Sequence, residues 1–345
     1  MGKRIAGINL AKNGSLVILQ DGEIEFYLEE ERVTRTKRDI SAKTLADQYI
    51  DSSVDALTIC DCFTRYTRQT FLERTKAKNE LCKIAKSKGC LEIVDYRDRH
   101  HECHAANALY NSGFDDAVCV VMDGKGSYFT DDSVAKIDGY ESAGVSLRYA
   151  EIESIYDYSG EFTPLFKHYS TFWSEDESEL IDEPYWYKGN LYSNRTSVGQ
   201  AFRRVSRYCN FEEIEAGKTM GLSAYGHHST PVDLFVEEYN HSLCSKDLYV
   251  SGNTTEYYGT KYRIEDLAYN LQKSAEKHAV FMIKKAVNLS GKKNVVVSGG
   301  FFLNCAANQC IMRELDVNLY VDPIAYDGGI AIGSALLHHY ETLAV

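Results

Sequence analysis

Short apolar stretches separated by turn-forming residues predict a strand meander at the start of the chain. Residues 5–10 are apolar, and residues 11–15 have the composition of a turn. Residues 16–19 and 24–28 are two further apolar stretches, and the Asp-Gly pair between them is typical of a tight hairpin. The pattern therefore predicts three strands joined by short turns.

A similar pattern returns in the middle of the chain. An apolar run at residues 117–122 is followed by a Gly-rich turn at 123–127 and a strand at 132–137. An Asp-Gly turn at 138–139 and another strand at 145–152 complete the pattern. Two copies of this order indicate an internal repeat, although two unrelated meanders would look the same. Actin-like and sugar-kinase-like ATPases are duplicated in this way, with a nucleotide between two related lobes and turn N–H groups facing its phosphates. We therefore expect an α/β fold with lobes at residues 1–114 and 115–345.

Helices are predicted where apolar residues recur at helical spacing. Three such segments, residues 42–50, 70–87 and 100–111, lie between the two copies of the strand pattern. A longer helix is expected near residues 264–288, whose apolar stripe consists of Leu267, Leu271, Ala275, Ala279 and Ile283.

Two other segments in the second half have a predicted role at a ligand site. Residues 294–298 read as a strand, and Gly299 and Gly300 follow it, an arrangement that suits close backbone approach to a ribose or phosphate. Residues 155–195 are Tyr-rich, acidic and weakly patterned. We expect an irregular insertion there that serves as a substrate lid.

Charge and composition narrow the classes of function. The net charge is −12, whereas a protein that grips extended duplex nucleic acid carries a basic stripe. Basic clusters occur at residues 32–38 and around Arg203, Arg204 and Arg207, but a solvated face explains each equally well. The apolar stretches are too short for a signal peptide or a transmembrane helix. The ten cysteines are therefore expected to be reduced thiols in a cytoplasmic protein.

Two histidines and two aspartates form a candidate metal site. His100 and His104 lie four residues apart, so a helix would place them on one face, where imidazoles suit zinc, iron and similar ions. The metalloprotease motif is excluded because His101, not Glu, follows the first histidine. Asp123 ends an expected strand and Asp327 precedes an expected helix at residues 330–337. Surface histidines and turn or N-cap aspartates would explain the same residues.

Several segments together resemble one family, the O-carbamoyltransferases of nodulation-factor and antibiotic biosynthesis. Their catalytic domain is similar to the universal tRNA threonylcarbamoyl-transfer protein. The matching segments are spread over nearly the whole chain, at residues 21–24, 29–38, 100–106, 112–115, 123–126, 217–222, 225–226, 298–300, 303–304 and 327–333.

The resemblance implies roles for individual residues. His100, His104, Asp123 and Asp327 match the metal ligands, with Fe²⁺ as the first choice and Zn²⁺ or Mn²⁺ as alternatives. The residues that match nucleotide-holding positions are Gly124, Gly126, Gly299, Gly300, Asn304 and Lys218. Arg32 and Lys37, in the same basic segment as Arg35, are expected to neutralise phosphate on the donor. The family makes carbamoyl-adenylate from ATP and carbamoyl phosphate, and then transfers the carbamoyl group to an alcohol.

Two departures from the family pattern affect these expectations. The first hairpin of the family carries a His-Asp pair, where this chain has Lys12 and Asn13. We place the catalytic position at these two residues and leave the general base open. Many members also continue into a domain that forms the carbamoyl-adenylate, whereas this sequence ends soon after Asp327. We expect either a separate polypeptide that supplies the donor or a different route to it.

The acceptor of the carbamoyl group is the least determined part of the predicted function. A sugar, a natural-product hydroxyl or a hydroxymethylated pyrimidine, free or in DNA, is compatible with the sequence, and nucleic acid enters only as an acceptor. No membrane partner is expected. Two other readings use the same fold: an ATP-dependent phosphotransferase of the sugar-kinase type, which leaves the histidine pair unexplained, and a non-catalytic nucleotide-binding partner.

Overall fold

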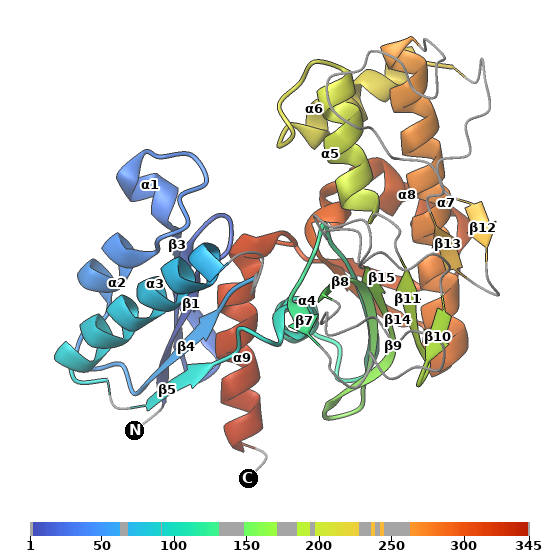
Figure 1. Ribbon diagram of the computed structural model, residues 1–345. Coiled ribbons are helices and arrows are strands. Elements are labelled where there is room, and N and C mark those ends of the chain that lie inside the picture. Colours follow the sequence, from blue (N-terminus) through green and yellow to red (C-terminus); the bar gives the residue numbers. More distant parts are fainter. Residues whose placement is uncertain are drawn as a thin grey trace, which may run out of the picture.

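The computed structural model places the chain in two lobes, each built on a β-sheet, with two helices between the sheets (Figure 1). The structure describes residues 3–62, 68–90, 92–130, 148–170, 185–193, 197–227, 236–238, 242–244 and 263–343. A membrane-spanning helix is not found in this described part of the chain.

The first lobe contains the predicted meander as three strands of a five-stranded sheet of order β3-β2-β1-β4-β5. Its strands are β1 (Arg4–Asn9), β2 (Ser15–Gln20), β3 (Glu23–Glu29), β4 (Ala56–Cys60) and β5 (Glu92–Asp95). Asp21 and Gly22 both have positive φ, 53° and 86°, as a two-residue hairpin requires. Strand β1 pairs antiparallel with β2 and parallel with β4.

Both faces of this sheet are covered, which explains why its central strands are apolar without alternation. Leu16 and Ile18 of β2 pack in a core with residues of α2 (Lys43–Tyr49) and α3 (Arg68–Ser87). Val17 and Leu19 point to the opposite face and pack against α9 (Ile330–Leu343). The short helix α1 (Glu30–Thr34) follows β3.

The second lobe is built on a larger sheet of order β10-β11-β9-β8-β6-β14-β15, with β7 paired to β8. Its strands are β6 (Ala117–Met122), β7 (Tyr128–Thr130), β8 (Arg148–Tyr158), β9 (Phe162–Ser170), β10 (Tyr185–Tyr187), β11 (Asn190–Ser193), β14 (Asn294–Ser298) and β15 (Asn318–Val321). Its helices are α5 (Val198–Tyr208), α6 (Ala216–Leu222), α7 (Ile264–Ser290) and α8 (Cys305–Glu314). A separate hairpin pairs β12 (Val236–Glu238) with β13 (Ser242–Cys244).

The central strands of the two sheets have matching partners. Strand β6 pairs antiparallel with β8 and parallel with β14, just as β1 pairs with β2 and β4. This correspondence agrees with the duplication expected from the sequence. The expected strand at residues 132–137 and the turn at 138–139 lie outside the described residues.

The segment 155–195 corrects one expectation. Most of its described residues belong to strands β8, β9, β10 and β11 of the main sheet, so the prediction of an irregular insertion is wrong for them. Strand β9 pairs with β8 through a register that contains two irregularities. A weak sequence period is the expected result, because a bulge shifts which residues face the core.

Helix α4 (His100–Ser112) and helix α9 lie against each other between the two sheets (Figure 1). Their close approach depends on Gly333, where a Cβ atom would lie 1.8 Å from the carbonyl oxygen of Cys103. Helix α4 packs on β6 and β14 of the second sheet, and α9 packs on β1, β2 and β4 of the first. The C-terminal helix therefore completes the N-terminal lobe.

Candidate functional site

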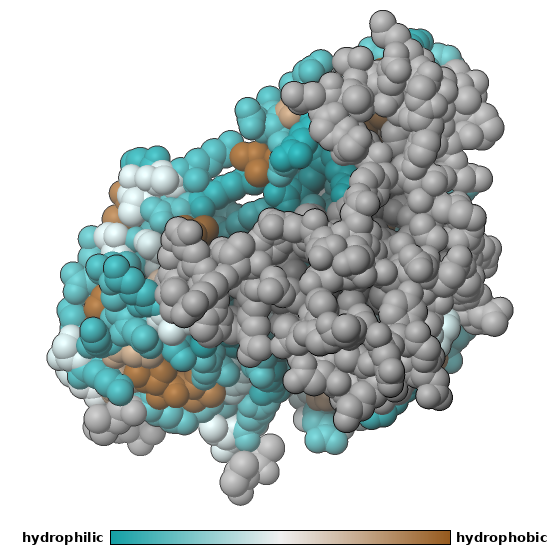
Figure 2. Space-filling view, in the orientation of Figure 1, coloured by the Kyte–Doolittle hydropathy of each residue, from teal (hydrophilic) through white to brown (hydrophobic). Residues whose placement is uncertain are grey.

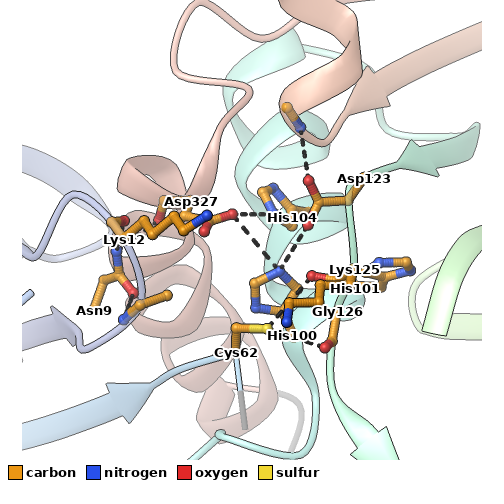
Figure 3. Close-up of polar contacts among 12 residues, drawn as sticks. Asn9, Lys12, Cys62, His100, His101, His104, Asp123, Lys125, Gly126 and Asp327 are labelled. Carbon is orange, nitrogen blue, oxygen red and sulfur yellow. Dashed lines mark hydrogen bonds and ion pairs between the residues drawn. The ribbon is translucent and has the colours of Figure 1, made fainter. Parts of the chain in front are cut away.

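The four predicted metal ligands converge at the junction of the lobes. His100 and His104 lie on successive turns of α4, Asp123 follows β6, and Asp327 begins the 3₁₀ turn Asp327–Gly329 before α9. One ligand atom from each residue lies within 4.8 Å of all the others. Figure 3 shows the two carboxylates on either side of the paired imidazoles.

The histidine nitrogens that face this centre lack hydrogen-bond partners. Both side chains have 0% exposure, and neither Nε2 atom makes a hydrogen bond. The nearest carboxylate oxygens lie 3.5 Å (Asp123) and 3.9 Å (Asp327) from Nε2 of His100, and 3.7 Å (Asp327) from Nε2 of His104. These separations exceed an ordinary hydrogen bond. Buried nitrogens without hydrogen bonds, facing carboxylates across a small gap, fit a cation held between them.

The outward-facing nitrogens of the same histidines do have partners. Nδ1 of His100 lies 3.3 Å from the carbonyl oxygen of Asp61, and Nδ1 of His104 lies 3.2 Å from the hydroxyl of Ser298. Metal-binding histidines commonly make such a second contact, which fixes the ring orientation. The donor set therefore fits a metal ion in both its inner and its outer contacts.

The pKa values of His100 and Asp123 also fit a cation at this centre. Burial lowers the pKa of His100, but Asp123 and Asp327 outweigh burial and raise that pKa to about 9. Burial would raise the pKa of Asp123, yet His100 and His104 hold it well below its usual range. Each group thus stabilises the opposite charge on the other. Metals bind the deprotonated forms of these ligands, so a cation would replace the proton on His100.

A cavity of about 580 Å³ is lined from both lobes and includes Asp123 and Asp327 of the four residues in its lining. Its basic lining consists of Lys12, Arg74, Lys125 and Arg203, and its apolar lining includes Phe202, Ile214, Met220, Phe301 and Leu303. In Figure 2, hydrophilic residues and a few hydrophobic ones line the part of the rim of the hollow between the lobes that is not grey. The volume lies within the range of small-molecule pockets. A lining that combines cations with apolar side chains suits a ligand with an anionic group and a flat apolar group.

The predicted glycines divide into two groups. Gly124 and Gly300 line the cavity, and the Gly300 N–H lies 3.4 Å from Oδ1 of Asp123. Gly299 has φ of 99°, and a Cβ there would lie 2.2 Å from the Met122 carbonyl oxygen, so it permits strand packing. Gly126 packs against the ring of His101, where a Cβ would lie 2.7 Å from ring atoms.

Asn304 also lines the cavity, but its side chain is engaged within the protein. Its Oδ1 accepts hydrogen bonds from the Ala307 N–H at 3.1 Å, which caps α8, and from Nε2 of Gln272 at 3.1 Å. Its Nδ2 donates to Oε1 of Gln272 at 2.9 Å. These contacts hold the wall of the cavity in place.

Lys12 and Asn13 point in different directions from the β1–β2 turn. Lys12 lines the cavity, and Figure 3 shows its side chain beside Asp327. Burial and the nearby Arg203 lower the pKa of Lys12. Nδ2 of Asn13 instead donates to Oε2 of Glu29 at 3.4 Å. The structure therefore brings only Lys12 of this pair to the site.

Three predicted donor-binding residues do not line the cavity. The Arg32 side chain is 65% exposed and lies 3.8 Å from Glu31. Lys37 is exposed, and Lys218 is 58% exposed with its Nζ 2.7 Å from Glu215. By contrast, Arg74 and Lys125 line the cavity although sequence reasoning assigned them no role. The sequence could have indicated Lys125, because it lies in the Gly-rich turn after β6. Nothing in the sequence indicated Arg74, which lies within a helix.

Comparison with known protein sequences agrees with the resemblance to the O-carbamoyltransferases. A family model described as the carbamoyltransferase N-terminus matches residues 48–336. Nodulation protein NolNO of Sinorhizobium fredii is 23% identical over 367 residues, which cover 95% of this chain and 46% of that protein. The tRNA N6-adenosine threonylcarbamoyltransferase of Thermococcus kodakarensis is 32% identical over 113 residues, 30% of this chain and 35% of that protein. The chain spans about half the length of the curated relatives that it matches along nearly all of its sequence.

Solved structures support the fold. HypF of T. kodakarensis superposes with a TM-score of 0.53 at 13% identity, covering 99% of this chain and 48% of that one. The ROK hexokinase of Thermus thermophilus gives a TM-score of 0.50 at 10% identity, covering 99% of this chain and 100% of that one. At these identities the likeness concerns fold alone. It confirms the expected two-lobed architecture of the actin-like and sugar-kinase-like class.

Proposed function

Because the chain belongs to the carbamoyltransferase family, whose N-terminal model matches residues 48–336, we propose that it transfers a carbamoyl group to an acceptor hydroxyl. The observation that carries this proposal is the convergence of His100, His104, Asp123 and Asp327 beside a cavity with a basic wall. The donor is proposed to be carbamoyl-adenylate, derived from carbamoyl phosphate and ATP.

We propose that the four converging residues hold a divalent metal, with Fe²⁺ as the first choice. Two imidazoles and two carboxylates form a mixed nitrogen and oxygen donor set, which suits iron, manganese or zinc. Such an ion, when bound, supplies a Lewis acid that stabilises negative charge on the donor. The outer contacts of His100 and His104 keep their rings directed at the centre.

The basic residues of the cavity have a defined task in this proposal. Protonated Lys12, Arg74 and Lys125 attract the phosphate of the donor and compensate its charge in a cavity where water is limited. Arg74 is itself anchored by Asp61, whose Oδ1 accepts its hydrogen bond at 2.8 Å. The approach of the donor to the backbone at Gly124 and Gly300 requires the absence of side chains there.

The apolar wall completes the proposed donor site. Phe202, Ile214 and Met220 come from α5, α6 and the segment between them, and they offer a surface for a nucleobase. The acceptor hydroxyl would then enter from the open side of the cavity. We propose a hydroxymethylated pyrimidine or a sugar as the acceptor, and a separate adenylate-forming protein as one source of the donor.

The test is mass spectrometry of candidate acceptors after incubation with the protein, carbamoyl phosphate, ATP and Fe²⁺. Parallel reactions contain a separately supplied carbamoyl-adenylate-forming protein. A sugar, a free hydroxymethylated pyrimidine nucleotide and the same base in DNA serve as acceptors. The expected product carries one additional carbamoyl group.

Two variants test whether the product depends on the candidate site, and a different product would indicate a different reaction. His104→Ala is expected to abolish the product, whereas His227→Ala is expected to retain it, because the His227 side chain is 64% exposed and does not line the cavity. A phosphorylated acceptor would instead indicate a phosphotransferase. If no acceptor gains a carbamoyl group under either donor supply, the proposed function is wrong.

A further inference from the structure

Asn9 is a buried polar residue that connects two turns at the candidate site. It is the last residue of β1 and has 0% exposure. Its Nδ2 donates to the carbonyl oxygens of Lys12 at 3.2 Å, Asn13 at 3.1 Å and Asp327 at 2.9 Å. Its Oδ1 accepts the Ala11 N–H at 2.6 Å. One amide group thus touches both the turn that carries Lys12 and the turn that carries Asp327.

Residues next to Asp327 are also held by β2 and β3 of the first lobe. The hydroxyl of Ser15 donates to the carbonyl oxygen of Gly328 at 2.8 Å, and the hydroxyl of Tyr326 donates to Glu29. The other three converging side chains come from α4 and the end of β6. The first-lobe hairpin therefore sets the place of Asp327 relative to the remaining three residues.

We propose that Asn9 is a positioning residue that fixes Asp327 and Lys12 relative to each other at the metal centre. This inference rests on the proposed function, in which Asp327 is a metal ligand. The hydrogen bonds of the Asn9 side chain all go to backbone groups, not to a side chain of the centre. Its effect on a metal would therefore pass through the position of the Asp327 carboxylate.

Asparagine suits this task because the position needs a donor and an acceptor on one short side chain. Aspartate has the same shape but would place carboxylate oxygens against three carbonyl oxygens. Alanine would leave the Ala11 N–H and the three carbonyl oxygens without the contacts that Asn9 provides. Serine keeps one donor on a shorter side chain, so it is expected to give an intermediate result.

The experiment measures Fe²⁺ and Mn²⁺ affinity of the full chain by anaerobic titration for wild type, Asn9→Ala, Asn9→Ser and Asp327→Ala. Thermal unfolding is measured on the same samples. Thr58→Val is the matched control, since it removes a buried hydrogen bond of 2.9 Å to Ser334 in the same lobe. Loss of a residue that orients a metal ligand typically weakens metal binding roughly 10- to 100-fold.

We expect Asn9→Ala to weaken metal binding by roughly 10-fold or more, within the range for outer contacts of metal ligands. Asn9→Ser should lie between it and wild type, and it replaces Asn9→Ala as the test if the alanine variant does not fold. Thr58→Val should bind metal within about twofold of wild type, a change that a tenfold effect clearly exceeds. Adding Asn9→Ala to Asp327→Ala should cost little more, because residues that act through one another are not additive.

The binding measurements distinguish a wrong role for Asn9 from a wrong metal centre. If wild type binds metal, Asp327→Ala binds it more weakly, and the Asn9 variants bind like wild type, the positioning role is wrong and the metal centre stands. An additive loss in the double variant would also overturn it, since Asn9 would then act independently of Asp327. If wild type binds neither metal, the proposed centre is wrong and the role of Asn9 falls with it.

Discussion

Two of the buried clusters of histidine and carboxylate in the described part of the chain differ in how closely their charged groups approach. In the candidate site, the Nε2 atoms of His100 and His104 lie 3.5–3.9 Å from carboxylate oxygens and make no hydrogen bonds. In the second cluster, Glu153 accepts contacts from Nδ1 of His168 at 3.2 Å and from Nε2 of His278. His168 also contacts the hydroxyl of Ser193 through Nε2 at 2.8 Å.

The comparison shows that burial of these residue types does not by itself make a metal site. The Glu153 cluster satisfies its own charges through direct contacts, so it is a structural link between β8, β9, β11 and α7. The His100 cluster leaves Nε2 atoms without hydrogen bonds beside carboxylates, as the proposed metal site requires. We therefore expect the Glu153 cluster to stabilise the fold and the His100 cluster to bind a metal.

The largest expected difference between the clusters is in metal binding. His104→Ala should weaken metal binding by more than roughly 100-fold, because loss of a ligand exceeds the effect of losing an outer contact. His168→Ala should leave the metal content per folded molecule unchanged. Elemental analysis of both purified variants measures this contrast, and metal loss from the His168 variant would make the two clusters equivalent.

The next expected effect concerns stability. Glu153→Ala removes the carboxylate shared by His168 and His278 and should lower the free energy of unfolding by about 3 kcal/mol. Denaturant titration of this variant and of wild type measures the change. Metal affinity of the folded fraction should match wild type. A variant as stable as wild type would show that the Glu153 cluster does not hold these elements together.

The Glu153 cluster should also make stability depend on pH. Burial would raise the pKa of Glu153, but His278 and His168 hold it well below the usual value of 4.5. A depressed folded-state pKa contributes stability that is present above about pH 4.5 and is lost as the pH falls below it. Unfolding curves between about pH 3 and pH 6 should therefore show a weaker acid sensitivity for Glu153→Gln than for wild type. Equal slopes would contradict the assigned role of Glu153.

The smallest expected effect is that of the Ser193 hydroxyl. Ser193→Ala removes the hydrogen bond to His168 and should cost about 1 kcal/mol of stability. Turnover and metal content should stay at wild-type values, since Ser193 contacts His168 of the second cluster. Paired measurements of unfolding and product formation check this outcome, and a selective loss of turnover would connect the clusters functionally.

Local sequence patterns were sufficient for much of the fold, and the structure brings the four predicted metal ligands together. The meander was predictable because hairpin turns and strand periods are local properties, and the family resemblance identified from motifs is confirmed by the match over residues 48–336. His100 and His104 could be paired from helical spacing alone. Asp123 and Asp327, which lie far apart in the sequence, were candidates from their places at a strand end and before a helix, and the resemblance implied that they share one metal with the histidines.

Other features depend on tertiary contacts that no local pattern encodes. The sequence pattern did not predict strands β9 to β11. The register between β8 and β9 is irregular, and the aromatic sequence of this segment has no clear period. Arg74 and Arg203 reach the cavity only through the packing of α3 and α5. Arg32, Lys37 and Lys218 were assigned to the donor from the resemblance, yet their side chains lie outside the cavity lining.

The packing of α9 on the first sheet has a consequence for how the chain is assembled during synthesis. Ile5, Val17 and Leu19 are fully buried or nearly so by residues of α9, more than 300 positions later in the sequence. One apolar face of the N-terminal sheet therefore stays exposed until α9 has emerged from the ribosome. Contacts of such long sequence separation slow folding and expose aggregation-prone surface in the meantime. A nascent chain stalled before residue 330 should for this reason depend on chaperones more than a chain from which α9 has emerged.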